Sequence, residues 1–102
     1  MPRITEDQVS HVVLQILAAR PSGRATVRML RIGLPNYLTL SADDRTDSDT
    51  RTNEEIWEQQ VRNLKSHQLT VGNIFQRGFV ESVGRGLWQI TEAGRLHLAA
   101  ST

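Results

Sequence analysis

The chain has 102 residues, a formal net charge of +1 and no cysteine, which bounds it to one domain with a single core and no disulfides or thiolate metal sites. It contains no apolar run near the roughly 18 residues that a membrane-spanning helix needs. The segment Met1–Glu6 lacks the apolar core of a secretory signal, so the sequence favours a cytoplasmic protein.

The small net charge hides an uneven distribution. The segment Asp43–Glu58 holds seven acidic and two basic residues, so it carries −5 and the rest of the chain carries +6. Eleven of the twelve basic residues are arginine, whose planar fork suits phosphate groups and guanine edges. A genome of high GC content produces the same arginine bias, so the composition permits a nucleic-acid partner without demanding one.

The first helix is predicted to start at Thr5, which forms a capping box with Gln8. Ile4 and Val9 stand at the staple positions on either side of the cap. The apolar residues that share one face at helical spacing are Val9, Val12, Val13, Ile16 and Leu17. The segment Arg20–Gly23 ends this helix.

Residues 24–27 are predicted to form a short strand that pairs with a hairpin near the C-terminus. A second helix starts near Thr26, is ended or kinked by Pro35, and buries Val27, Leu30 and Leu34, with Met29 as a further candidate. The segment Tyr37–Leu40 is expected to pack as a final turn or as a short extended piece. Residues 41–53 contain almost no apolar side chain, so a solvated, mobile loop is expected there.

A third helix is predicted from a capping box of Thr52 and Glu55. Its apolar face comprises Trp57, Val61 and Leu64, and its opposite face comprises Gln59, Arg62, Asn63 and Ser66. Gly72 interrupts the pattern, which leaves two alternatives: one long kinked helix, or a break followed by a short helix through residues 74–76. Gly78 is expected at the C′ position, just after the helix end.

The last third of the chain predicts a hairpin and a final helix. Two strands, 79–83 and 87–91, flank a turn of Gly84, Arg85 and Gly86, with a cation at its tip. The strand residues expected in the core are Phe79, Val83, Leu87 and Ile90, and both tryptophans, Trp57 and Trp88, are expected to be buried. Thr91 is expected to cap a helix over residues 93–100 that buries Leu96, with Ala99 as a further candidate.

An amphipathic helix followed by a cation-tipped hairpin is typical of winged-helix DNA-binding domains. The predicted fold is therefore α+β and mainly helical, a winged helix-turn-helix with a three-helix core, a short first strand, a two-stranded wing and a C-terminal helix. The candidate base-reading residues, chosen as donors and acceptors of fixed length, are Gln59, Arg62, Asn63, Ser66, His67, Gln68 and Thr70. The candidate contacts to the DNA backbone are Lys65, Arg77, Gly84, Arg85 and Gly86.

Catalysis finds little support in the chain. There is no glycine-rich phosphate loop and no nucleophile elbow, and Lys65, the only lysine, follows Asn63 rather than the carboxylate that a common nuclease motif requires. The three histidines, His11, His67 and His97, lack the spacing of a helical metal site. We therefore expect no catalytic residue, no metal and no cofactor.

Two segments resemble the winged-helix domain at the N-terminus of Mrr-type restriction endonucleases. Trp57–Arg62 is similar to that family's Trp-Glu-x-x-Val-Arg helix start. Gly78–Glu81 stands where the family has a Gly-Leu-Ile/Leu-Glu turn, and Gly86–Gly94 is similar to its Gly-x-Trp-x-Ile-Thr-x-x-Gly wing strand. The stretch 65–73 makes the region of the third helix longer than is usual in the family. Two segments could therefore enter the major groove of DNA: residues 59–66, or the piece after Gln68.

The resemblance implies a DNA-recognition module, residues 1–102, taken from a larger prokaryotic restriction endonuclease and fused to or associated with a nuclease domain. It further implies recognition of methylated duplex DNA, including N6-methyladenine. The residues that could supply an apolar patch for a methyl group are Leu69, Thr70, Val71 and Ile74. Two alternatives remain: a stand-alone dimeric transcription regulator that pairs through Leu96 and Leu98, and a winged helix that contacts protein through its acidic segment.

Overall fold

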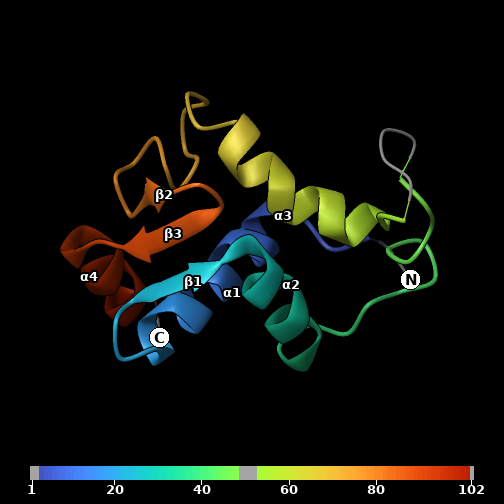
Figure 1. The fold of residues 1–102 in the computed structure, drawn as a ribbon, viewed down its shortest axis with the longest axis horizontal. Helices are drawn as coiled ribbons and strands as arrows, with labels where there is room; N and C mark the ends of the chain where they lie inside the picture. The colour runs from blue at the N-terminus through green and yellow to red at the C-terminus, as the bar shows by residue number, and fades with distance from the viewer. Residues whose placement is uncertain (1–2, 49–52, 102) are drawn as a thin grey trace.

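The computed structural model describes residues 3–48 and 53–101 and confirms the α+β class. The described residues form four α-helices, one 3-10 helix and a three-stranded antiparallel sheet (Figure 1). In chain order the elements are α1 (Glu6–Ala19), β1 (Arg24–Thr26), α2 (Val27–Gly33), η1 (Leu34–Asn36), α3 (Ile56–Ser66), β2 (Val80–Gly84), β3 (Leu87–Ile90) and α4 (Glu92–Ala100).

Helix α1 is the centre of the core and contacts α2, α3, α4 and β3. Its predicted capping box is confirmed, because Gln8 donates its N–H to Thr5 Oγ1 at 3.1 Å and accepts from the Thr5 N–H at 2.8 Å. Leu14 is buried although it lies off the predicted face, because α1 has neighbours on several sides. Ile16 was predicted on the apolar face and is only partly buried. Leu30 of α2 and Leu34 of η1 are buried as predicted, whereas Val27 and Met29 are partly buried.

The sheet has the order β1–β3–β2, so the predicted pairing of the first strand with the hairpin is confirmed. Ala25 lies opposite Trp88, and Val80 lies opposite Ile90. Because alternate strand residues share a face, Trp88 and Ile90 both point into the core. The prediction that Val83 is buried is wrong, because the register shifts between Ser82 and Gly84 and the Val83 side chain is 37% exposed.

Helix α3 buries Trp57, Val61 and Leu64, which confirms its predicted apolar face. Its start was predicted too early: Glu55 is the N-cap residue, and its N–H donates to Glu58 Oε1 at 3.0 Å. Thr52, the expected cap, lies outside the described residues.

After Ser66 the chain breaks into turns, as the second alternative anticipated, but it forms no further helix before β2. Asn73 stabilises the break, because its Nδ2 donates to Leu64 O at 2.9 Å and its Oδ1 accepts from Phe75 N at 2.7 Å. Gly78 has φ +76° and ends one isolated turn. Phe79 N donates to Ile74 O at 2.9 Å and Gly78 N to Phe75 O at 3.0 Å, which is the Schellman pattern with its glycine at C′, as predicted.

Helix α4 starts at the predicted cap, where Thr91 Oγ1 accepts from Gly94 N at 3.0 Å. The prediction that Leu96 and Ala99 are buried is wrong, because Leu96 is 65% exposed and Ala99 is exposed. Gly94 is the buried residue of this helix, and the absence of a side chain allows the first turn to lie against the Phe79 carbonyl. That contact turns Leu98 toward the core and Leu96 toward solvent.

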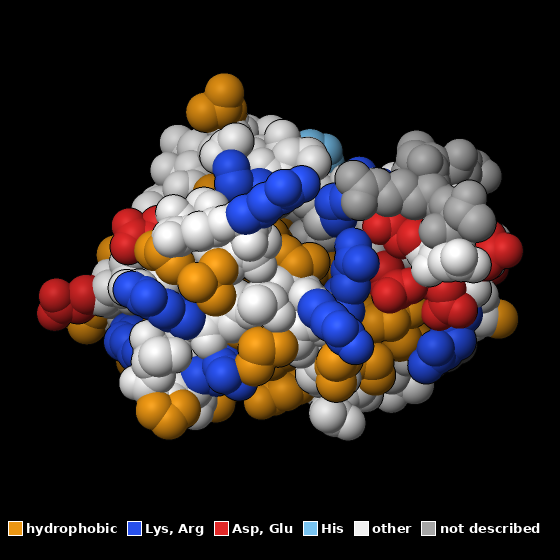
Figure 2. Space-filling view, in the orientation of Figure 1, with side chains coloured by type: hydrophobic (Ala, Val, Ile, Leu, Met, Phe, Trp, Pro, Cys, Tyr) orange, Lys and Arg blue, Asp and Glu red, His pale blue; other side chains and the backbone are white. Residues whose placement is uncertain are grey.

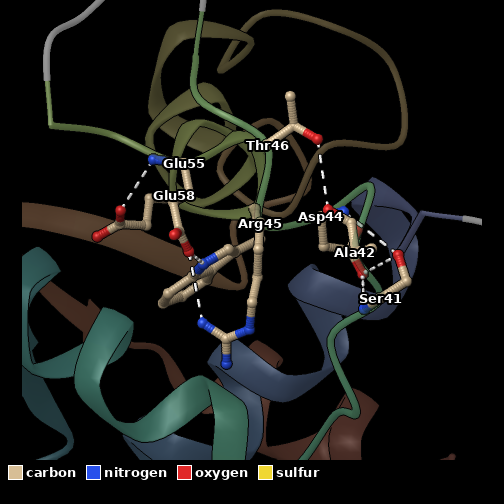
Figure 3. A network of polar contacts seen from close by, with 8 residues as sticks. Ser41, Ala42, Asp44, Arg45, Thr46, Glu55 and Glu58 are labelled. Atoms are coloured by element: carbon tan, nitrogen blue, oxygen red, sulfur yellow. Dashed lines mark hydrogen bonds and ion pairs between the residues drawn. The ribbon is translucent and has the colours of Figure 1, made fainter.

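Residues 41–53 were predicted to be a solvated loop, and most of the described ones, 41–48 and 53, are exposed, but Ser41 and Asp44 are buried. Asp44 is 1% exposed and accepts a hydrogen bond from Ile4 N at 2.9 Å. It also accepts from Ser41 N at 2.8 Å (Figure 3). Arg45 reaches Glu55 at 3.4 Å across the start of α3. The carboxylate of Asp44 therefore joins the segment before α1 to the segment before α3.

Candidate nucleic-acid interface

A groove of about 1000 Å³ lies between α2, α3 and the turn of the β2–β3 hairpin. The basic residues that line it are Arg28 and Arg31 from α2, Arg62 and Lys65 from α3, and Arg85 from the hairpin turn. Glu58 is the acidic residue of the lining, so the formal charge of the lining is +4. Figure 2 shows Lys and Arg side chains gathered over the surface where these elements meet, with a cluster of acidic side chains to their right and further acidic side chains at the left edge.

Local hydrogen bonds bring the hairpin turn to the start of α2. Thr26 ends β1 and caps α2, with its Oγ1 accepting from Met29 N at 3.1 Å. Val27 N donates to Gly86 O at 2.9 Å, and Gly86 has the positive φ, +64°, that a tight turn requires. Arg28 and Arg85 therefore stand on the same side of the molecule, although 57 positions separate them in sequence.

Both tryptophans form part of the groove floor and are confirmed as core residues. Trp57 is 7% exposed and Trp88 is 2% exposed. The Trp88 ring packs edge-on against Phe75 with centroids 4.9 Å apart, and Trp57 Nε1 donates to Glu55 Oε1 at 2.8 Å. Because their faces are covered, these rings shape the groove rather than offer a surface on which a base could stack.

Two of the groove arginines share one buried carboxylate. Glu54 is 5% exposed, and its oxygens accept from Arg62 Nε at 3.1 Å, from Arg62 Nη2 at 3.0 Å and from Arg31 Nη2 at 3.2 Å. The hydrogen bond from Arg62 lowers the pKa of Glu54 below its ordinary value of 4.5 against the opposing effect of burial. Glu54 thus links α2 to α3 at the side of the groove.

The predicted base-reading residues do not form one surface. Ser66 lines the groove with Arg62 and Lys65, whereas Gln59 and Asn63 lie around the helix beside Arg3. The Gln59 side chain accepts a hydrogen bond from Ser48 Oγ at 2.9 Å. At about 100° per residue, positions 59, 62, 63 and 66 lie within about 100° of one another, so one face was predicted. The structure divides it, because α2 and the hairpin turn border the groove beside Arg62 and Ser66 only.

The remaining predicted readers follow α3 and are exposed. His67 Nδ1 lies 3.3 Å from Glu6 Oε1, and Gln68 Oε1 accepts from Lys65 Nζ at 2.8 Å. Thr70 is exposed in the next turn. These three side chains are therefore grouped around the C-terminal end of α3 rather than inside the groove.

The residues predicted to contact the DNA backbone lie together in the groove, with one exception. Gly84, Arg85, Gly86 and Lys65 all line the groove. Arg77 is not among its lining residues, and its guanidinium lies 4.5 Å from the Phe79 ring centroid. The Phe79 ring stacks on His97 in turn, with centroids 4.4 Å apart.

Of the residues expected to form an apolar patch for a methyl group, one is buried. Ile74 is 5% exposed and belongs to the core. Leu69 and Val71 are 90% and 89% exposed in the turn after α3, with Thr70 between them. The exposed part of the patch is therefore residues 69–71.

Sequence reasoning did not identify Arg28, Arg31 or Glu54. A signal for the two arginines existed, because positions three apart on a predicted helix share a face. Glu54 had no such signal, since it is one of several carboxylates in the acidic segment and its partners come from two other places in the chain.

Metal and membrane sites gain no support from the described ranges. No group of three or more His, Asp or Glu side chains within them is placed to hold a metal ion. None of their helices is long and apolar enough to cross a membrane.

Comparison with protein-family models, with curated proteins and with solved structures found no match. Proposals on function therefore rest on the geometry and charge of the chain itself.

Proposed function

We propose that the chain is a winged-helix domain that binds double-stranded DNA. The observation that carries the proposal is the groove between α2, α3 and the hairpin turn, whose lining has a formal charge of +4. In this reading α1, α2 and α3 are the three-helix core, and β2 and β3 are the wing. The element order and the sheet order β1–β3–β2 support it.

A duplex fits this groove through one of its sugar–phosphate backbones. An α-helix of about 10–12 Å diameter fits a major groove of about 12 Å, so α3 would lie there while the wing tip approaches the adjacent minor groove. The backbone between the two grooves then runs past Arg28, Lys65 and Arg85. Ser66, which lines the groove at the end of α3, is the side chain that would reach base edges there.

The proposal extends to the recognition module of a modification-dependent restriction endonuclease, acting with a fused or associated nuclease domain in a prokaryotic cytoplasm. Leu69 and Val71 support this extension, because exposed aliphatic side chains beside hydrogen-bonding groups suit a base methyl group such as that of N6-methyladenine. No catalysis is assigned to the chain.

The test is fluorescence anisotropy with matched short duplexes across a salt series. Three phosphate contacts predict a slope of log K against log salt of about −2.7, so affinity should fall about 40-fold between about 50 and about 200 mM salt. Arg85→Ala should flatten the slope to about −1.8, which reduces the loss to about 12-fold. Arg95→Ala, which removes an exposed arginine of α4, is the matched control and should leave the slope unchanged.

The outcomes separate the proposal from its alternatives. Absence of binding at low salt, or equal effects of the Arg85 and Arg95 substitutions, would reject the DNA interface. For methyl recognition, Leu69→Ser should narrow the preference for an adenine-methylated over an unmodified duplex, with a cytosine-methylated duplex as the specificity control. Equal loss on all three duplexes would reject methyl reading while keeping DNA binding.

A dimeric transcription regulator is the second candidate, and the observation that favours it is Leu96, 65% exposed on α4. Sedimentation equilibrium decides this point, since a monomer at high micromolar concentration rejects pairing through α4. Protein contact through the acidic segment is less favoured, because Asp44 and Glu54 are buried and Arg45 pairs with Glu55. Partner binding that persists at high salt without DNA would support that third reading.

A further inference from the structure

Glu54 divides the cations of the groove into two classes. Arg31 and Arg62 are 27% and 22% exposed, and both direct guanidinium nitrogens to the Glu54 carboxylate, which is 5% exposed. Among the described residues no ion pair involves Arg28, Lys65 or Arg85. Five basic residues line the groove, but two of them already face a carboxylate.

The contact with Glu54 joins two elements. Arg31 belongs to α2 and Arg62 to α3, so the shared carboxylate holds the two helices at one spacing. Arg62 makes the stronger contact, with Nε and Nη2 on the two carboxylate oxygens at 3.1 and 3.0 Å. Arg31 contributes one contact, Nη2 to Glu54 Oε2 at 3.2 Å, and its buried Nε finds no acceptor within the described part of the chain.

We propose that Glu54 is a positioning residue that holds Arg31 and Arg62 as a joint between α2 and α3, so that Arg28, Lys65 and Arg85 make the phosphate contacts of the groove. The inference rests on the proposed DNA-binding function and specifies which of the groove's charges serve it. Arg62, a candidate base reader by sequence, is in this view a residue of the joint.

Electrostatics favours this division of roles. A cation contributes to the salt dependence of DNA binding only if it neutralises a phosphate and so releases condensed counterions. An arginine that left Glu54 for a phosphate would remove one of the two cations that compensate this buried carboxylate, which is unfavourable. The hydrogen bond from Arg62 also lowers the pKa of Glu54, so the carboxylate stays ionised at neutral pH.

The first experiment compares two arginines of α2 by the salt slope of duplex binding. Arg28→Gln should reduce the magnitude of the slope by about 0.9, whereas Arg31→Gln should leave it at the wild-type value. The two residues are three positions apart on one helix and both line the groove, so each substitution is the matched control of the other. A decrease for Arg31→Gln equal to that for Arg28→Gln overturns the inference.

The second experiment removes the charge of Glu54, the carboxylate that Arg31 and Arg62 share. Glu54→Gln should increase the magnitude of the slope by about 0.9, as Arg31 becomes available to phosphate. In that background Arg31→Gln should now reduce the magnitude by about 0.9. Asp43→Asn removes the same charge from an exposed position of the same segment and should leave the slope unchanged.

A folded Glu54→Gln variant with the wild-type slope, or an Asp43→Asn variant with the same increase, overturns the inference. If circular dichroism shows that Glu54→Gln does not fold, the comparison of Arg28 with Arg31 decides alone. Absence of duplex binding by the wild-type chain at low salt overturns the DNA proposal together with this inference, whereas normal binding with equal effects at the two arginines overturns this inference only.

Discussion

The position of α4 depends on Gly94, and Gly94→Ala tests that dependence. The Phe79 carbonyl accepts from Thr91 N at 2.9 Å, directly beneath the first turn of α4. A Cβ atom at position 94 would overlap the Phe79 oxygen and would lie 2.8 Å from Cγ1 of Ile90. The closest atom is the backbone oxygen of Phe79, which cannot turn aside as a side chain can, so α4 itself must move.

The expected cost follows from these contacts. Alanine improves intrinsic helix propensity by up to about 1 kcal/mol. To restore a normal separation between the new Cβ atom and its neighbours in Phe79 and Ile90, helix α4 must shift by roughly 1 Å, since contacts are optimal at about 3.5–4.0 Å. That shift would sacrifice the Thr91–Phe79 hydrogen bond, at about 1 kcal/mol, and overpack the site, at about 1–3 kcal/mol. We expect a net loss of about 1–3 kcal/mol in the free energy of unfolding.

Urea denaturation followed by the fluorescence of the two buried tryptophans measures this loss, provided that the m-value stays at the wild-type value. Gly33→Ala is the matched control. A Cβ there would lie 3.3 Å from Cδ1 of Ile16, the flexible end of a side chain, so stability should change by less than about 1 kcal/mol. A Gly94→Ala variant as stable as Gly33→Ala would refute the steric reasoning.

Two further predictions concern the buried carboxylates. Asp44→Ala leaves two buried backbone N–H groups without their acceptor and should cost about 2–5 kcal/mol in urea denaturation, whereas the exposed Asp43→Ala should change stability by less than about 0.5 kcal/mol. Equal effects would contradict the assigned role. Because Arg62 lowers the pKa of Glu54 from 4.5, the ionised carboxylate stabilises the fold at higher pH, and this contribution is lost as the pH falls through the lowered pKa. The stability difference between wild type and Glu54→Gln should therefore shrink as the pH falls from neutral to below 4.5, and a constant difference would contradict the ion pair.

Local rules identified much of the fold. The capping box of Thr5 and Gln8, the apolar spacing of Trp57, Val61 and Leu64, and the C′ glycine Gly78 are all read from neighbours within a few positions, and all three are confirmed. The hairpin turn at residues 84–86 was equally predictable, because glycine flanks its cation on both sides. The same rules failed at the start of α3, where several acidic and hydroxyl residues could each serve as the cap.

The candidate site was only partly predictable for the same reason. Lys65 and Arg85 were identified because a helix and a hairpin turn are local features. The separation of Gln59 and Asn63 from the groove depends on where α2 and the hairpin pack around α3, and no pattern within α3 contains that information.

By itself the sequence established the order of helices and strands, the cation at the hairpin tip and the excess of positive charge outside the acidic segment. Tertiary structure decided which charges are buried and which remain available. Asp44 is bonded to a backbone group 40 positions away, and Glu54 to arginines 23 and 8 positions away. A carboxylate can be buried only where other segments supply its hydrogen-bond donors, so the fate of each charge depends on contacts between segments rather than on its neighbours in the chain.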